Sequence, residues 1–163
     1  MSEQTVWRLE GAETREPFHY TECGLDNVYL ASGYEKSTSP DGEEGVRVHN
    51  VEGLLEAIGI FLATRKKELV GQELRYLRKH IGMTQKELGG YVRLTSQQVA
   101  RWEKDQCKAQ GSAEAIVRVL FLEHVLGTTL VTELLRDLDS ADDNGPDVAL
   151  FEETDDGWQA KAA

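Results

Sequence analysis

Apolar side chains recur at intervals of three and four residues from position 51 onward, a spacing that gathers them on one face of an α-helix. The first such face consists of Leu54, Leu55, Ile58, Phe61 and Leu62. The same spacing predicts helices over 71–80, 113–126 and 128–138, with Gly127 ending the second of them. The chain is therefore predicted to be mainly α-helical between residues 51 and 138.

Two short helices are predicted between residues 84 and 104 from their N-terminal caps. Thr84 is followed three residues later by Glu87, a pair that forms a capping box, so a helix should begin there and extend to Tyr91. Thr95 is a second N-cap and predicts a helix over 96–104. Only residues 92–94 separate the two helices, which is the spacing of a helix-turn-helix.

The pattern before residue 51 is different. Residues 18–34 place aromatic and β-branched side chains around turn formers, which predicts short strands and a hairpin. Residues 37–45, STSPDGEEG, predict a loop, and residues 46–48 predict a further short strand. We therefore expect a small β-rich module over 18–50, preceded by a flexible arm over 1–17.

The sequence after residue 138 is acidic and rich in turn formers. It begins SADDNGPD and predicts an acidic tail over 139–163, with one strand at 148–151. The expected fold is thus mainly α with a small N-terminal β-rich module. Its helical domain covers 51–138 and contains the helix-turn-helix at 71–104.

Charge is distributed unevenly along the chain. The net charge is −11, yet residues 65–108 hold eleven Lys and Arg against five Asp and Glu, a net of +6. All other residues together therefore carry −17. A basic segment between acidic modules indicates a nucleic-acid-binding region, because DNA binding depends on neutralising phosphates. Ordinary charge clustering on a solvated helical surface is the alternative.

Composition excludes several classes of protein. The two cysteines, Cys23 and Cys107, provide neither a disulfide framework nor a four-cysteine zinc site, so both are expected to be free thiols. No apolar run approaches the roughly 20 residues that cross a bilayer, and the N-terminus lacks the regions of a secretory signal. We expect a cytoplasmic protein with no membrane association.

No catalytic or cofactor motif is present. The sequence contains no P-loop, no dinucleotide-binding glycine pattern and no GxSxG nucleophile turn. His19, Cys23 and His49 could ligate a metal together with a fourth residue, but their spacing follows no zinc-finger pattern. We therefore expect neither an enzyme nor a cofactor or metal site.

Residues 69–106 resemble the helix-turn-helix of the Cro/repressor family, also called the XRE family. The matching residues are Leu77-Arg78 in the first helix, MTQKEL at 83–88 and VARWEK at 99–104. The chain departs from the family at Gly89-Gly90, where alanine and a polar helix former are usual. The resemblance implies a repressor-like five-helix domain whose partner is double-stranded DNA.

The helix predicted over 96–104 has an inner face and an outer face. Val99 and Trp102 are three residues apart and should face the core. Gln97 and Arg101 share another face, and their side chains can form bidentate hydrogen bonds with adenine and guanine in the major groove. The family resemblance also places base contacts at these two residues and at Ser96.

Other residues of this segment are expected to bind DNA phosphates. Gln85 matches the family glutamine that contacts the DNA backbone, and its place at a helix N-terminus favours anions. The remaining candidates are Lys86, Arg93, Gln98 and Lys104. The alternative is that Gln97 and Gln98 are solvated surface residues and that Arg101 pairs with Glu103 or a neighbouring acid.

Two observations predict a homodimer that binds a palindromic operator. One recognition helix reads only a few base pairs, so such proteins gain affinity from two half-sites. The helices after Gly111 also carry broad apolar faces that suit a two-fold interface. We accordingly expect a transcriptional repressor or autoregulator.

The order of the two modules is similar to that of the MqsA-type antitoxins. These proteins bind an operator through a C-terminal domain and a toxin through an N-terminal one. The MqsA family holds its N-terminal domain on zinc with two CxxC pairs, whereas only Cys23 lies in that region here. The resemblance therefore implies an antitoxin as the alternative function, with an N-terminal module that folds without metal and binds a toxin. The acidic module could instead bind a basic protein, or serve as a ligand-sensing or dimerising unit.

Overall fold

The structure is a computed structural model that describes residues 17–64, 68–140, 150–154 and 157–161. The chain divides into two compact units, Met1–Thr128 and Thr129–Ala163. The arm expected over 1–17 lies, except for Pro17, outside the described residues.

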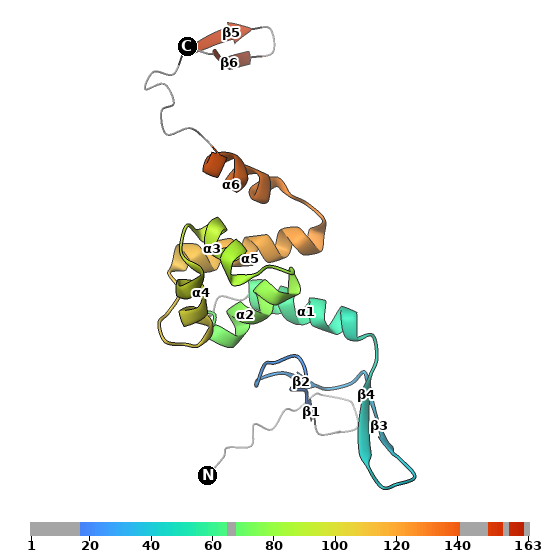
Figure 1. Ribbon diagram of the computed structural model, residues 1–163. Helices are drawn as coiled ribbons and strands as arrows, with labels where there is room; N and C mark the ends of the chain where they lie inside the picture. The colour runs from blue at the N-terminus through green and yellow to red at the C-terminus, as the bar shows by residue number, and fades with distance from the viewer. Residues whose placement is uncertain (1–16, 65–67, 141–149, 155–156, 162–163) are drawn as a thin grey trace. The chain divides into compact units, whose positions relative to one another are not determined.

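The first unit contains five helices in its described part. They are α1 (Val51–Thr64), α2 (Gly71–His80), α3 (Gln85–Val92), α4 (Ser96–Glu103) and α5 (Gly111–Leu126). α5 packs against α1, α2 and α3, while the short pair α3 and α4 pack on each other (Figure 1). The helical domain with its helix-turn-helix therefore has the fold class expected from the sequence.

The core of this unit is shared by all five helices. Leu77, Leu88, Val99, Val117 and Phe121 are completely buried in it. At the contact of α1 with α5, the ring of Phe121 occupies the space where a side chain at Gly59 would lie, so only glycine fits there. The core therefore holds α2, α3 and α4 against one long helix.

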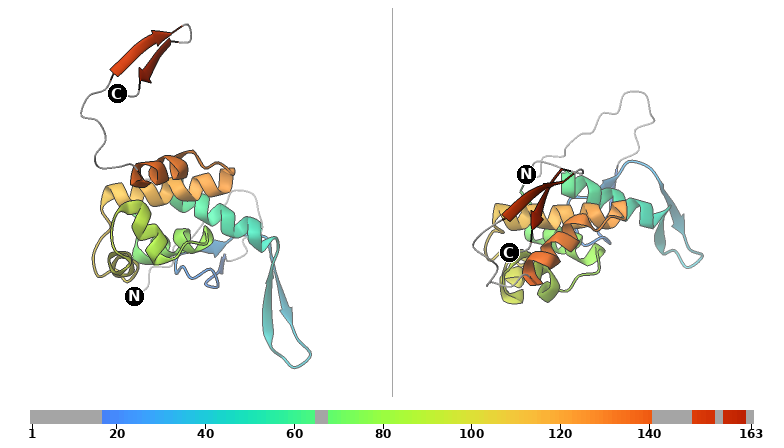
Figure 2. Two further views of the ribbon diagram at one scale, coloured as in Figure 1. Left: turned by 45° about the horizontal axis from the view of Figure 1, so that its top comes forward. Right: turned by 90° about the horizontal axis from the view of Figure 1, so that it is seen from above.

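The N-terminal residues form two small antiparallel sheets. β1 (Phe18–His19) pairs with β2 (Tyr29–Leu30), and β3 (Tyr34–Thr38) pairs with β4 (Glu44–Val48). Leu25, between β1 and β2, is buried in the helical core and links the module to the helices. Figures 1 and 2 show the β3–β4 hairpin extending from the N-terminal end of α1, away from α3 and α4.

The loop expected over 37–45 is shorter than predicted. Ser37 and Thr38 belong to β3 and pair with Gly45 and Glu44. A turn over the intervening residues closes with a hydrogen bond from the Ser39 amide to the Glu43 carbonyl, and Gly42 adopts a φ of +82° that glycine tolerates. The tight turn leaves the flanking polar residues free to extend both strands.

The second unit begins with α6 (Leu130–Ser140), two residues later than expected. β5 (Leu150–Thr154) and β6 (Gly157–Lys161) form an antiparallel hairpin within the region expected to be an acidic tail with one strand. The tail interpretation was therefore incomplete. The second strand was missed because the acidic composition of this region favours an unstructured tail.

Candidate nucleic-acid interface

The N-terminus of α2 is fixed to the end of α4. The Gly71 amide donates to Oδ1 of Asp105 at 2.7 Å, and the Val70 amide donates to Oε2 of buried Glu73 at 3.0 Å. A side chain at Gly71 would meet the carbonyl oxygen of Trp102 at 2.5 Å. Two carboxylates thus cap the positive end of α2, and glycine allows its backbone to approach α4.

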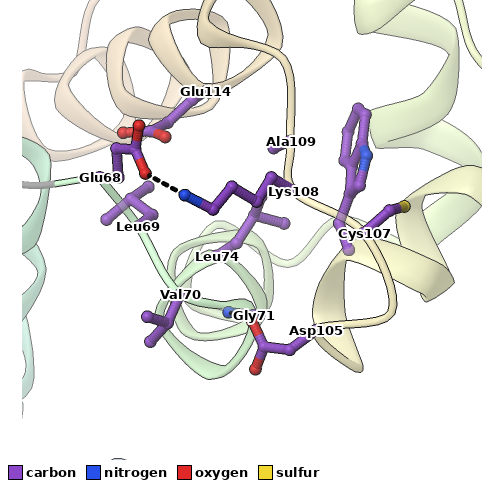
Figure 3. Close-up of a pocket in the computed structure, with 11 residues that line it drawn as sticks. Glu68, Leu69, Val70, Gly71, Leu74, Asp105, Cys107, Lys108, Ala109 and Glu114 are labelled. Carbon is purple, nitrogen blue, oxygen red and sulfur yellow. Dashed lines mark hydrogen bonds and ion pairs between the residues drawn. The ribbon is translucent and has the colours of Figure 1, made fainter.

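A pocket of about 320 Å³ lies beside this contact, lined by α2 and the segment that follows α4. Figure 3 shows Lys108 and Glu68 facing each other among the lining residues, with Nζ and Oε2 2.9 Å apart and Leu69 and Leu74 nearby. Both charged side chains are largely exposed, so this ion pair contributes little to stability.

A buried ion pair joins α2 to α4. Nε and Nη2 of Arg78 donate to the two carboxylate oxygens of Glu103 at 2.5 and 3.0 Å, and Nη1 donates to the Met83 carbonyl at 2.6 Å. The two charged side chains are only 9% and 4% exposed. Nε2 of Gln85 also donates to Glu103, at 2.9 Å, so one carboxylate fixes α2, α3 and α4 together.

The capping box expected at the start of α3 is confirmed. The Glu87 amide donates to the Thr84 hydroxyl at 3.1 Å, and the Thr84 amide donates to the Glu87 carboxylate at 2.7 Å. The hydrogen bonds that the backbone and side chain of Thr84 make with Glu87 lower the pKa of this carboxyl group below its usual value. The first turn of α3 is therefore well defined, including Gln85 and Lys86.

The two glycines of α3 have different surroundings. A side chain at Gly89 would lie 2.6 Å from the Leu94 carbonyl, whereas a side chain at Gly90 would meet nothing within 4 Å. The Leu94 amide also donates to the Gly89 carbonyl at 2.8 Å. Gly89 therefore lets the turn fold back closely onto α3, which explains this departure from the usual alanine, while Gly90 is not needed for space.

The turn itself contains a residue in a left-handed conformation. Arg93 caps the C-terminus of α3 with φ +55° and ψ +41°, a region that favours glycine or asparagine. Its side chain is exposed. An arginine therefore occupies a place where backbone energetics favour glycine.

α4 presents the outer face that the sequence predicts. Thr95 caps it, since its hydroxyl accepts from the Gln98 amide at 3.2 Å. Trp102 is 2% exposed and faces the core. Ser96, Gln97 and Arg101 are exposed, the last two one turn apart.

The alternative pairing of Arg101 with Glu103 does not occur, because Glu103 binds Arg78 and Gln85. Within the part of the chain that the structure describes, Arg101 forms no ion pair. Its guanidinium remains available to a ligand at the surface of α4.

The expected phosphate-binding residues fall into two groups. Lys86, Arg93 and Lys104 are exposed cations. Gln85 and Gln98 are half-buried and bonded within the protein, Gln98 by its Nε2 to Sγ of Cys107 at 3.3 Å. The three cations can contact phosphates directly. To bind a phosphate, the side-chain amide of Gln85 or Gln98 would have to give up or share its present hydrogen-bond partner.

Sequence reasoning missed the residues that position this surface. Arg78 and Glu103 were not singled out as a pair, although each lies four residues after a buried apolar residue, Leu74 and Val99 respectively. That spacing places them on the inner faces of their helices and was the available signal. Asp105 and Cys107, which hold Gly71 and Gln98, carried no comparable signal.

The expected metal candidates are not gathered into a site. Among the described residues no group of three His, Cys, Asp or Glu side chains is arranged to hold a metal. His19 donates to the Asp26 carbonyl, Cys23 contacts the Tyr20 carbonyl, and His49 lies 3.3 Å from Glu35. Both cysteines are free thiols, as expected. No helix in the described ranges has the length and apolar character required to span a bilayer.

Comparison with known proteins agrees with this geometry. Residues 74–126, from within α2 to the end of α5, match a family model described as helix-turn-helix. Neither the curated proteins nor the solved structures gave a match to the chain. The matched segment covers the buried ion pair, both capped helices and the exposed face of α4. The chain thus contains a helix-turn-helix over residues 74–126.

Proposed function

We propose that the protein is a sequence-specific transcriptional regulator, a repressor or autoregulator, that binds duplex DNA through α4. The observation that carries this proposal is the contrast between the two faces of α4. Its inner face is fixed by Val99, Trp102 and the Glu103 ion pair, while Gln97 and Arg101 project from the outer face. A rigid helix with exposed bidentate hydrogen-bonding side chains suits the major groove. The proposal includes no catalytic step and no cofactor.

Base reading and phosphate binding are assigned to different residues. The N-terminal part of α4 enters the major groove, where Gln97 and Arg101 read base edges and Ser96 lies beside them. Phosphates on either side are bound by residues of α3, the turn and the ends of α4: Gln85, Lys86, Arg93, Gln98 and Lys104. Exposed Arg75, Lys79 and Lys108, which the sequence analysis did not assign, add to the positive charge of residues 65–108.

This division is tested with two alanine variants. Arg101→Ala should weaken binding to the operator by about 1–3 kcal/mol and leave binding to random DNA nearly unchanged. Lys86→Ala should weaken binding to both duplexes similarly and lower the slope of log affinity against log salt by about one. The measurement is fluorescence anisotropy over a series of salt concentrations. Equal losses on operator and random DNA for both variants would contradict the assignment.

The dimer is proposed from the apolar surface of α6. Leu130 and Leu134 lie one turn apart on this helix and are 77% and 55% exposed. Two copies of such a stripe, packed across a two-fold axis, would remove both leucines from water and place two recognition helices on a palindrome. Sedimentation should give a dimer at micromolar concentration and a monomer for Leu134→Glu. A monomer for the unaltered chain would exclude this arrangement.

The alternative function, an antitoxin, is supported by the charge of the N-terminal region. Residues 17–64 carry eight carboxylates and two Lys or Arg, a net of −6, which does not suit DNA but does suit a basic protein. The discriminating observation is a small basic reading frame beside this gene. Co-expression of its product should then yield a complex that forms without DNA. A regulator that acts alone would form none.

A further inference from the structure

An apolar groove lies at the junction of the N-terminal module with α1. Its volume is about 300 Å³. One wall is α1, where Leu54, Ala57, Ile58 and Phe61 follow one another at helical spacing. The opposite wall is the segment from Leu25 to Leu30, whose side chains are apolar except for Asp26 and Asn27. The groove is thus lined mostly by apolar side chains.

Large aromatic side chains at this groove are open to solvent. Phe61 is 61% exposed and Tyr29 is 53% exposed, whereas Ile58 and Leu62 on α1 and Leu25 and Leu30 in the module are buried. The sequence pattern groups Phe61 with the apolar face of α1, yet α5 and α2 cover only part of that face. Contiguous apolar surface beside a pocket is characteristic of a protein-binding site.

The negative charge of the residues around the groove favours a basic partner. The region from 17 to 64 has a net charge of −6, and the exposed carboxylates include Asp26 beside the groove and Glu52 and Glu56 on α1. A second copy of the chain would bring the same negative charge to the contact, as would the acidic residues after 138. A basic partner is attracted by the same field.

We propose that this groove binds an amphipathic helix of a partner protein, with its apolar face against Phe61, Ala57 and Tyr29 and basic residues on its flanks. A helix is the occupant because the α1 wall repeats every three to four residues, which matches the spacing of anchors on a facing helix. The inference deepens the proposal that the N-terminal module binds a protein. It is independent of DNA binding, since the groove is built from α1 and the module and α4 contributes nothing to it.

The test uses the full chain and synthetic peptides as probes. A fluorescent amphipathic helix of leucine and lysine is compared with a scrambled peptide of the same composition and with a leucine and glutamate version. Ala57→Lys blocks the groove with a residue that α-helices accept readily. Ala115→Lys is the matched control, because it makes the same change of charge at an exposed alanine of α5. Circular dichroism of both variants checks that the helices are retained.

We expect saturable binding of the leucine and lysine helix only. Ala57→Lys should weaken its affinity roughly tenfold, as expected for the loss of one central anchor, and Ala115→Lys should leave the affinity unchanged. Equal binding of the scrambled peptide, or equal weakening of binding by both variants, would contradict the proposal that the groove is the binding site. Binding would then reflect only attraction between the net charges of the peptide and the protein. Sedimentation of the chain alone gives a further check: self-association abolished by Ala57→Lys alone would make a second copy the occupant. Operator binding is measured on the same samples. Its absence would contradict the proposed DNA-binding function without bearing on the groove.

Discussion

The helix-turn-helix and the N-terminal module differ in the side chains that they expose and in how they are held. In the helix-turn-helix, α4 is held by a buried carboxylate that binds both Arg78 and Gln85, and the outward side chains are polar. In the module, two small sheets are joined to the helices through the buried side chain of Leu25, and large apolar side chains remain exposed. A surface that reads base edges needs fixed polar groups, whereas a surface that binds a protein relies on apolar area.

The largest effect is expected from breaking the buried ion pair. Arg78→Ala leaves the Glu103 carboxylate buried without its cation, which should lower the free energy of unfolding by about 3–5 kcal/mol. Urea denaturation measures this loss. A loss of this size would show that the helix-turn-helix depends on the buried Arg78–Glu103 ion pair.

The control for this prediction replaces both charges. The double substitution Arg78→Met with Glu103→Leu removes the desolvated charges together, so it should cost less than Arg78→Ala alone. A cost below about 1 kcal/mol for the single variant, which is typical of exposed pairs, would mean that the contact does not fix α4.

The attachment of the module is tested at Leu25. This side chain is 1% exposed within the helical core, so Leu25→Ala should cost about 2–4 kcal/mol through lost burial and a residual cavity. The matched control is Leu126→Ala, at a leucine that is 72% exposed, for which little change is expected. Equal, small effects in urea denaturation would show that the module is not part of the same cooperative unit.

The two adjacent glycines of α3 give a smaller and opposite pair of effects. Gly89→Ala should destabilise by about 1–3 kcal/mol, because its methyl group would collide with the Leu94 carbonyl. Gly90→Ala should stabilise by about 1 kcal/mol, because alanine is the better helix former and the site is open. Thermal unfolding of both variants checks the signs. Stabilisation by both alanines would show that the turn does not require close approach to α3.

Arg93 should show the smallest change in stability. Arg93→Gly removes the steric cost of the left-handed conformation, which should raise the free energy of unfolding by about 1 kcal/mol. The greater conformational freedom of glycine in the unfolded chain offsets part of this gain. It should also lower the salt slope of DNA binding by about one. Arg93→Asn is the control, since it removes the charge while tolerating the conformation. If Arg93→Gly is less stable than the original chain, the turn is not strained.

The predictable features of the fold were those encoded locally. Threonine caps fixed the starts of α3 and α4, and the face shared by Val99 and Trp102 placed α4 correctly. The Arg78–Glu103 pair could not be located in this way, because it joins residues that are distant in sequence and meet only after packing. The exposure of Phe61 was hidden for the same reason, since periodicity marks an apolar face without showing how much of it is covered.

The central claim is that α4 reads DNA sequence, and it is tested most directly by competition between two duplexes. The full chain and its Gln97→Ala, Arg101→Ala double variant are titrated against the region upstream of the gene and a scrambled duplex, at two salt concentrations. We predict selective binding of the upstream duplex by the original chain, and loss of that selectivity in the double variant with residual binding to both duplexes. Absence of selectivity at either salt concentration, or selectivity retained by the double variant, would contradict the account.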